Sequence, residues 1–199
     1  MRKANGKYIA EVGSRLVLLA GRAAVGKSTL SSSLTRLLPE AAFVPELVFF
    51  EWSELDDIGD AFRRKDYPRP DLLLDGWSRI LRAVDGAPWI VHDGCWVPLG
   101  EDLPWASWDA IIDFADRTFE LAAPYDPVVF FLHGDGAQIK PRIEARGWTV
   151  PPESDAQEWS DKIHRILTRT GVTIIDLDAT QPVDAVLGDA LAALTSSSV

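Results

Sequence analysis

Short apolar runs alternate with longer amphipathic stretches along most of the chain. Five runs are each continuous enough for a strand buried on both faces, and glycine, proline or aspartate follows each of them: 15–20, 41–44, 89–92, 127–133 and 172–177. Buried strands separated by helical patterns are typical of a parallel sheet with helices on both sides. The pattern therefore predicts an α/β protein of three layers, α/β/α, around a five-stranded parallel sheet.

Three of the intervening stretches have clear helical spacing. The first covers 27–38 and directly follows the first predicted strand. The second covers 154–170, where Ser154 is placed to cap the start and Gly171 to end the helix. The third covers 183–194 near the end of the chain. Helical segments thus follow the first, fourth and fifth predicted strands, as in repeated β-α units.

Composition places the chain among ordinary globular proteins. With 199 residues, 47% of them hydrophobic and 25% charged, we expect one domain over 1–199. The net charge of −10 disfavours a nucleic-acid polymer as partner, because such binding needs many cations against phosphates. A single cysteine fits a reducing cytoplasm. The basic start lacks the apolar run of a signal peptide, and no stretch has the length of a membrane span, so we expect neither export nor a membrane anchor.

The strongest chemical signal lies between the first predicted strand and the first predicted helix. Residues 21–28, GRAAVGKS, satisfy the phosphate-loop pattern Gly-x₄-Gly-Lys-Ser/Thr. A loop of this kind aims backbone N–H groups and a helix N-terminus at an anion. We expect Lys27 to reach the β- and γ-phosphates of ATP and the Ser28 hydroxyl to bind Mg²⁺. The expected nucleotide-binding residues are Gly21, Arg22, Ala23, Ala24, Val25, Gly26, Lys27, Ser28 and Thr29.

With this loop, the chain resembles the P-loop kinases, in particular the nucleoside and nucleoside-monophosphate kinase group. Three further stretches carry the resemblance: Phe43-Val44-Pro45-Glu46 followed by Trp52, then Asp93, and Arg142-Ile143-Glu144-Ala145-Arg146. The resemblance implies a P-loop kinase-like sheet of strand order 2-3-1-4-5. It also implies an acceptor-binding region at about 46–88 and a lid at about 136–153.

The resemblance assigns chemical roles to the charged residues in these stretches. Glu46 and Asp93 are both candidates for the base that accepts a proton from the acceptor, and Asp93 is also a candidate Mg²⁺ ligand. Arg142 and Arg146 are four residues apart, so we expect them to share a helix face and to stabilise charge on the γ-phosphate. A helix cap for Asp93 and a surface position for the arginines are the alternative interpretations.

Aromatic and basic residues in the middle of the chain suggest an acceptor site. Of eight tryptophans, six lie between the second predicted strand and the helix after the third: Trp52, Trp77, Trp89, Trp96, Trp105 and Trp108. We expect most of them in the core, with Trp52 and Trp96 lining a pocket for a ring. Arg63 and Arg64 could hold an acceptor phosphate. The three histidines, His92, His133 and His164, have no metal-ligand spacing and are expected to be structural.

The sequence thus predicts an ATP- and Mg²⁺-dependent kinase that phosphorylates a hydroxyl or phosphate of a ring-bearing small molecule. A natural-product or antibiotic phosphotransferase of the same fold is one alternative. A P-loop NTPase that works as a regulatory switch on a protein partner is another. The acceptor, the choice between ATP and GTP, and the oligomeric state, including a homodimer, are left open.

Overall fold

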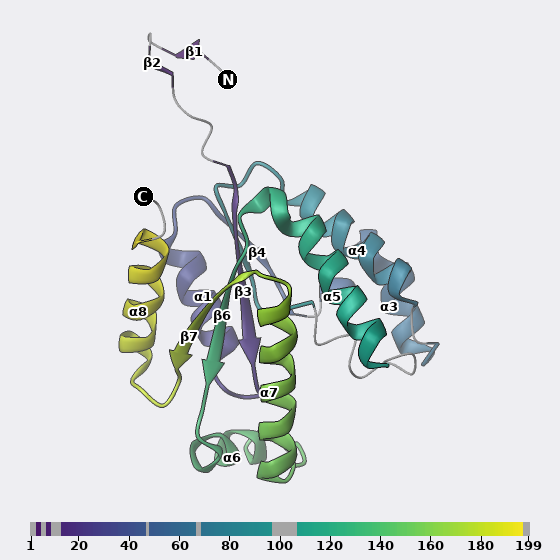
Figure 1. The fold of residues 1–199 in the computed structure, drawn as a ribbon, viewed down its shortest axis with the longest axis vertical. Coiled ribbons are helices and arrows are strands. Elements are labelled where there is room, and N and C mark those ends of the chain that lie inside the picture. The colour runs from purple at the N-terminus through teal and green to yellow at the C-terminus, as the bar shows by residue number, and fades with distance from the viewer. Residues whose placement is uncertain are drawn as a thin grey trace.

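The computed structural model describes residues 3–4, 7–8, 13–46, 48–66, 69–96 and 107–196, and a sheet lies at its centre (Figure 1). The sheet has five strands: β3 (Arg15–Gly21), β4 (Ala41–Val44), β5 (Trp89–His92), β6 (Val128–His133) and β7 (Thr173–Asp178). A separate antiparallel pair, β1 (Lys3–Ala4) and β2 (Lys7–Tyr8), precedes it.

The five strands are all parallel, in the order β4-β5-β3-β6-β7. Numbered within this sheet, the order is 2-3-1-4-5, which confirms the expected sheet. The central strand, β3, is buried over every residue after Arg15. Because β3 is covered on both faces, its sequence is a continuous apolar run, and this is why it could be recognised.

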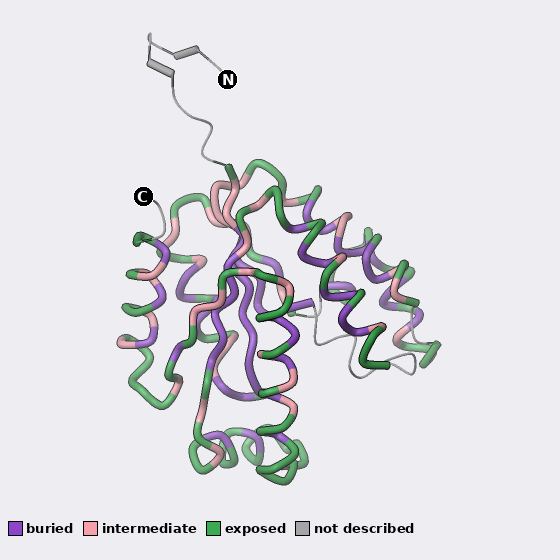
Figure 2. Tube along the Cα trace, in the orientation of Figure 1, coloured by how far each residue is buried: buried purple, intermediate pink, exposed green. Residues whose placement is uncertain are grey.

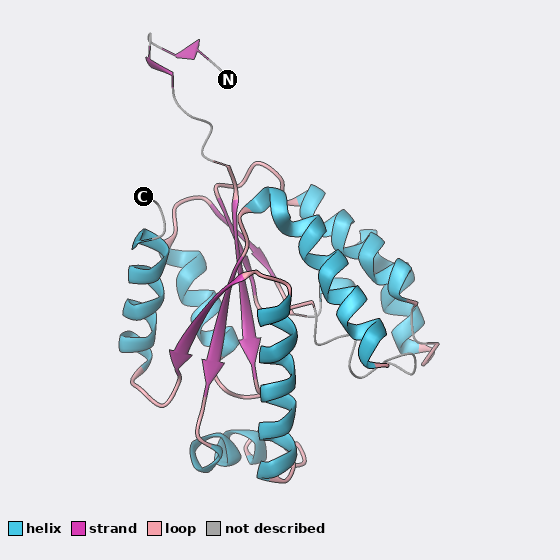
Figure 3. Ribbon diagram, in the orientation of Figure 1, coloured by secondary structure: helices cyan, strands magenta, loops and turns pink. Residues whose placement is uncertain are grey.

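Helices cover both faces of the sheet, which confirms the three layers (Figure 3). One face packs on α1 (Lys27–Leu37) and α8 (Val183–Ser196). The other packs on α4 (Pro70–Ala83), α5 (Trp108–Ala122) and α7 (Glu153–Arg169). The remaining helical elements are α2 (Val48–Glu51), η1 (Ser53–Leu55), α3 (Asp56–Arg63), η3 (Ala123–Tyr125) and α6 (Gly136–Glu144).

Side chains of β3 alternate between two apolar cores. Leu16 and Leu18 face the core under α4, α5 and α7, whereas Val17 and Leu19 face the core under α1 and α8. Figure 2 shows the central strands β3, β5 and β6 buried along most of their length, whereas the edge strands β4 and β7 are more exposed. Both cores therefore meet at the central strand, which holds rigid the loop that follows it.

The structure corrects one expected helix end. The helix predicted to be capped by Ser154 begins at Glu153, with Pro152 at the capping position. The Ser154 hydroxyl instead donates to the Asp155 carboxylate at 3.1 Å. Gly171 ends this helix as expected, with φ of +73°. No helix among the described residues is long and apolar enough to cross a membrane.

Candidate functional site

The loop between β3 and α1 takes a backbone path that glycine makes accessible. Gly21 has φ of +135° and Gly26 has φ of +120°. At Gly21 a Cβ atom would lie 2.5 Å from the carbonyl oxygen of Leu132 on β6, so the loop leaves the sheet in close backbone contact with the next strand. Gly26 stands at the N-cap of α1 and no side chain caps that end. The helix N-terminus is therefore open towards an anion.

Lys27 lies across this loop. Its ammonium donates to the carbonyl oxygens of Gly21 at 3.2 Å and Arg22 at 3.3 Å. It also lies 3.8 Å from Oε1 of Glu46, which follows β4. The cation thus stands between the loop and the carboxyl end of a second strand, the edge at which open α/β sheets bind ligands.

Arg22 has a partner outside the loop. Its guanidinium, in a residue only 7% exposed, forms a two-bonded ion pair with Glu153, at 2.6 and 3.0 Å. The hydrogen bond from Arg22 holds the pKa of Glu153 below its usual value. Because Glu153 is the first residue of α7, this pair ties the loop to the helix that follows the expected lid. The side chain of Arg22 is already paired, whereas its backbone remains part of the loop.

A cavity of about 300 Å³ opens above the loop. The loop residues that line it are Gly21, Ala23, Ala24, Gly26, Lys27, Ser28 and Thr29. The other side chains at the wall come from distant parts of the chain: Glu46, His92, Cys95, Trp96, Arg146, Trp148 and Trp159. The structure therefore brings the loop, one candidate base, one candidate lid arginine and several aromatic rings to a single space.

Asp93 is close to this cavity but does not line it. It follows β5, is 8% exposed, and its backbone N–H donates to the Val44 carbonyl at 2.8 Å. Oδ1 of Asp93 is buried and accepts no hydrogen bond from any described residue. A Cβ atom at Gly94 would lie 3.3 Å from Cγ of Glu46, so the two candidate bases are neighbours at this edge. A buried carboxylate oxygen without a donor points to a ligand that supplies one positive group.

His92 was expected to be structural, yet it lines the cavity. Both ring nitrogens are buried and make no hydrogen bond with the described residues. Burial lowers the pKa of His92 below its ordinary value of 6.5, outweighing the opposing effects of the Gly94 backbone and the Asp93 charge. The ring is therefore neutral near pH 7, with one donor and one acceptor nitrogen available. Its place at the end of the third strand, beside Asp93, was the signal available in the sequence.

The two candidate lid arginines do not share a helix face. Helix α6 ends at Glu144, so Arg146 lies in the turn that follows, with its guanidinium 5.1 Å from the centre of the Trp148 ring. Arg142 remains on α6, and its Nη1 lies 3.5 Å from the carbonyl oxygen of Val25. Both arginines line a second cavity of about 230 Å³, and Arg146 alone also reaches the first. The expectation of one helix face was wrong, but both arginines reach the loop.

The two tryptophans chosen for the acceptor pocket have different positions. Trp96 lines the cavity although it is only 1% exposed, and its indole N–H donates to the Leu73 carbonyl at 3.2 Å. It stacks on Trp77, with the ring centres 5.5 Å apart. Trp52 is half-buried against the core and does not line the cavity, so its expected place in the pocket is not found. Trp105 lies outside the described residues.

The basic cluster lies on the surface of α3 and its C-terminal turn. Arg63 is exposed, pairs with Asp60 one turn earlier, and has its guanidinium 5.4 Å from the ring centre of Phe50. Arg64 is exposed at the end of the same helix. Neither arginine lines the cavity above the phosphate loop.

No family model matches the sequence, and no curated protein matches it. Solved structures do match over nearly the full length. A gluconokinase from Sinorhizobium meliloti is 18% identical with a TM-score of 0.54, covering 94% of each chain. The tunicamycin resistance protein of Deinococcus radiodurans is 16% identical with a TM-score of 0.56, covering 91% of this chain and 95% of that one. A deoxyadenosine kinase from M. mycoides with bound dATP is 14% identical with a TM-score of 0.57, covering 90% and 99%.

The chain has the P-loop kinase fold. The likeness extends over at least nine-tenths of the chain in each of these comparisons. At these identities the likeness defines the architecture, and the chemistry has to be argued from the residues of the cavity.

Proposed function

We propose that this protein is an ATP-dependent kinase that transfers the γ-phosphate to a hydroxyl or phosphate of a ring-bearing small molecule. The observation that carries the proposal is the shared cavity, in which Lys27 of the phosphate loop lies 3.8 Å from the Glu46 carboxylate. One side of this space suits the transferred phosphate and the other offers a proton acceptor and aromatic walls. A simple nucleotide-binding switch has no need for a proton acceptor and aromatic walls beside the phosphate.

The residues at the loop fit Mg²⁺. The Ser28 hydroxyl at the start of α1 and the buried, undonated Oδ1 of Asp93 are both hard oxygen ligands, which this cation prefers. Ser28 and Asp93 would hold the cation, which would supply positive charge to neutralise the phosphates. We assign Asp93 to the metal with Ser28 because its buried Oδ1 has no hydrogen-bond partner among the described residues, whereas the Glu46 carboxylate lines the cavity.

The assignment of Asp93 leaves Glu46 as the base. Its carboxylate faces the cavity, so it can accept a proton from an acceptor hydroxyl held there. Lys27 and Arg146 line the same space and stabilise negative charge that develops on the transferred group. The neutral His92 ring lines the same space and is placed to form a hydrogen bond with a bound substrate.

The second cavity provides a place for the nucleotide base. It lies beside Val25 and Gly26 of the loop and extends to Ala179, Gln181 and Val183, between β7 and the start of α8. Arg142 and Arg146 stand between this space and the loop. A nucleotide bound along the loop would therefore have its base on one side and its γ-phosphate directed towards Glu46.

Turnover measurements on a panel of acceptors test this proposal. The panel holds nucleosides, nucleoside monophosphates and ring-bearing natural products with a free hydroxyl; similarity to a tunicamycin resistance protein is a reason to include the last group. The true acceptor should accelerate ADP formation by orders of magnitude and yield phosphorylated product in equal amount. Rapid ATP hydrolysis that no acceptor changes, but a protein partner stimulates, would replace the kinase with the switch.

Variants of charged residues locate the chemistry. Lys27→Met should abolish transfer, and Glu46→Gln should lower kcat at least ~100-fold. Glu51→Gln is the matched control, because Glu51 is an exposed carboxylate on α2 that does not line the cavity. Equal losses in Glu46→Gln and Glu51→Gln would show that the base lies elsewhere.

The basic cluster separates two acceptor classes. Neutralising Arg63 and Arg64 together should raise KM for a monophosphate acceptor and leave KM for an uncharged alcohol unchanged. Since neither arginine lines the cavity, an effect on KM for the monophosphate requires the acceptor to extend across α3.

The single cysteine makes a reducing cytoplasm the expected setting.

A further inference from the structure

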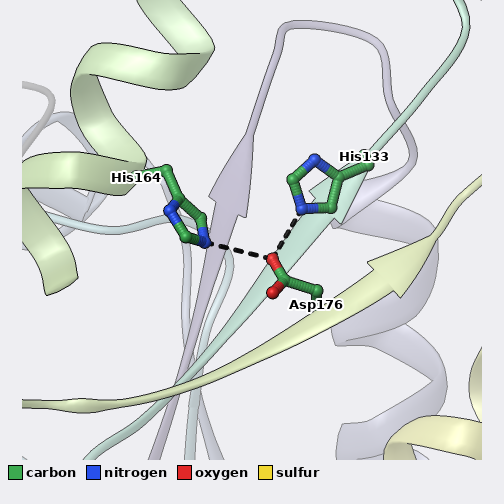
Figure 4. Close-up of side chains that lie close together, drawn as sticks. All are labelled: His133, His164 and Asp176. Atoms are coloured by element: carbon green, nitrogen blue, oxygen red, sulfur yellow. Dashed lines mark hydrogen bonds and ion pairs between the residues drawn. The ribbon is translucent and has the colours of Figure 1, made fainter.

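Two histidines and an aspartate from three different elements meet away from the phosphate loop. His133 ends β6, Asp176 lies in β7 and His164 lies on α7 (Figure 4). Nε2 of His133 is 2.6 Å from Oδ1 of Asp176, and Nε2 of His164 is 3.2 Å from the same oxygen. One ligand atom from each of the three residues lies within 4.8 Å of the others.

The topology explains why local spacing did not reveal this cluster. In the parallel register His133 lies opposite Asp178, so Asp176, two residues earlier, points to the same face of the sheet. That face is covered by α7, which brings His164 over the two strands. The buried Phe131 ring lies 4.9 Å from the ring centre of His133 and 5.0 Å from that of His164. Both imidazole rings therefore pack against a buried aromatic side chain.

We propose that His133, His164 and Asp176 form a three-ligand site for a divalent cation of the zinc class. Imidazole nitrogen and carboxylate oxygen bind zinc at roughly 2.0–2.2 Å, which puts tetrahedral ligand atoms about 3.3 Å apart. The 3.2 Å separation matches that spacing, all three ligand atoms lie within 4.8 Å of one another, and the 2.6 Å contact is a hydrogen bond that a cation would replace.

Access and charge favour an ion at this position. The side chains of His133, His164 and Asp176 are 49%, 34% and 55% exposed, and they open onto a shallow pocket along α7. Glu158 and Asp161 line the same pocket and outnumber its one arginine, Arg165. The fourth coordination position faces this pocket, so water or an external ligand can occupy it.

The site differs in kind from the oxygen ligands at the phosphate loop. Two imidazoles select zinc and related transition metals, whereas Mg²⁺ favours carboxylates, hydroxyls and water. His133 immediately precedes the turn into α6, and His164 lies on α7, which follows the lid. A bound cation would therefore cross-link the strand that leads into the lid and the helix that leaves it. This inference does not depend on the proposed kinase activity.

Zinc titration of the tag-free chain tests the site. Calorimetry without nucleotide, in excess Mg²⁺ to fill oxygen sites, should show one Zn²⁺ bound per chain. His133→Asn, His164→Asn and Asp176→Asn should each weaken binding at least about 10- to 100-fold. Asp161→Asn is the matched control on the pocket rim, and Cys95→Ser tests binding at the thiol. The proposal would be overturned if the three ligand variants bound Zn²⁺ with wild-type affinity, or if only Cys95→Ser lost Zn²⁺ binding.

Imidazole NMR of the wild-type chain gives a second measurement that needs no variant to fold. The chain has three histidines. Zn²⁺ should shift the ring nitrogens of His133 and His164 and leave those of the buried His92 unchanged. Unchanged rings at His133 and His164 would reduce the cluster to a hydrogen-bonded bridge and refute the metal site.

Discussion

Alanine substitutions at the two positive-φ glycines of the phosphate loop should distinguish two contributions to stability, namely backbone conformation and close packing. Gly21 has φ of +135° and Gly26 has φ of +120°, so alanine at either position is strained by about 1–3 kcal/mol. At Gly26 a Cβ atom meets nothing within 4 Å, and conformational strain is the whole effect. At Gly21 the Cβ atom would lie 2.5 Å from the Leu132 carbonyl oxygen and 3.3 Å from a Val25 methyl. Such overlap adds about 1–3 kcal/mol.

Urea unfolding, followed by tryptophan fluorescence, measures the difference. We expect Gly21→Ala to be less stable than Gly26→Ala by about 1–3 kcal/mol, a large share of the ~5–15 kcal/mol of an ordinary domain. For a chain of this length, each kcal/mol corresponds to about 2–4 °C in Tm. The slope of the transition should be the same in both variants. Equal stability within ~0.5 kcal/mol would show that β6 does not hold the loop as described.

Three further predictions concern charged or ionisable groups. Glu153→Gln removes the anionic partner of Arg22 and should lower Tm, whereas the control Glu158→Gln on the same helix should leave Tm unchanged. Thermal unfolding measures both variants, and equal Tm values would show that the ion pair does not stabilise the fold. His92 has a pKa lowered from 6.5, so the folded state keeps the ring neutral while the unfolded chain takes up a proton below that pH. Stability should fall on acidification below about pH 6.5, by up to about 1.4 kcal/mol per pH unit, and His92→Phe should show a shallower dependence. Arg142→Ala loses the contact with the Val25 carbonyl and should raise KM for ATP, as steady-state kinetics would show; an unchanged KM would place Arg142 outside the nucleotide site.

The strands that the sequence predicted well are those with apolar surroundings on both faces of the sheet. β3, β5 and β6 are buried on both faces, so each appears as an unbroken apolar run. The phosphate loop is recognisable because its backbone path requires glycine and its anionic ligand requires lysine, both at fixed spacing. Their order in the sheet was supplied by resemblance to a known fold, since apolar runs do not say which strands are neighbours.

The parts of the site that the sequence missed depend on tertiary packing. Trp148, in the expected lid, and Trp159, on α7, line the cavity more than a hundred residues from the loop, and no local pattern connects them to it. Arg146 was placed on a helix because its spacing from Arg142 fits one turn, but α6 ends two residues before it. His164 joins its partners only because α7 packs over β6 and β7. Residue spacing reveals ligands that lie on one helix or strand, but it cannot reveal ligands that come from three separate elements.

The ion pair between Arg22 and Glu153 joins the phosphate loop to the first residue of α7. Free energies of binding are reciprocal: if phosphates on the loop change the equilibrium position of α7, then any ligand that shifts α7 changes phosphate affinity by the same factor. His164 lies three turns further along that helix. A cation that shifts α7 from His164 would therefore change phosphate affinity at the loop without any contact between the two ligands.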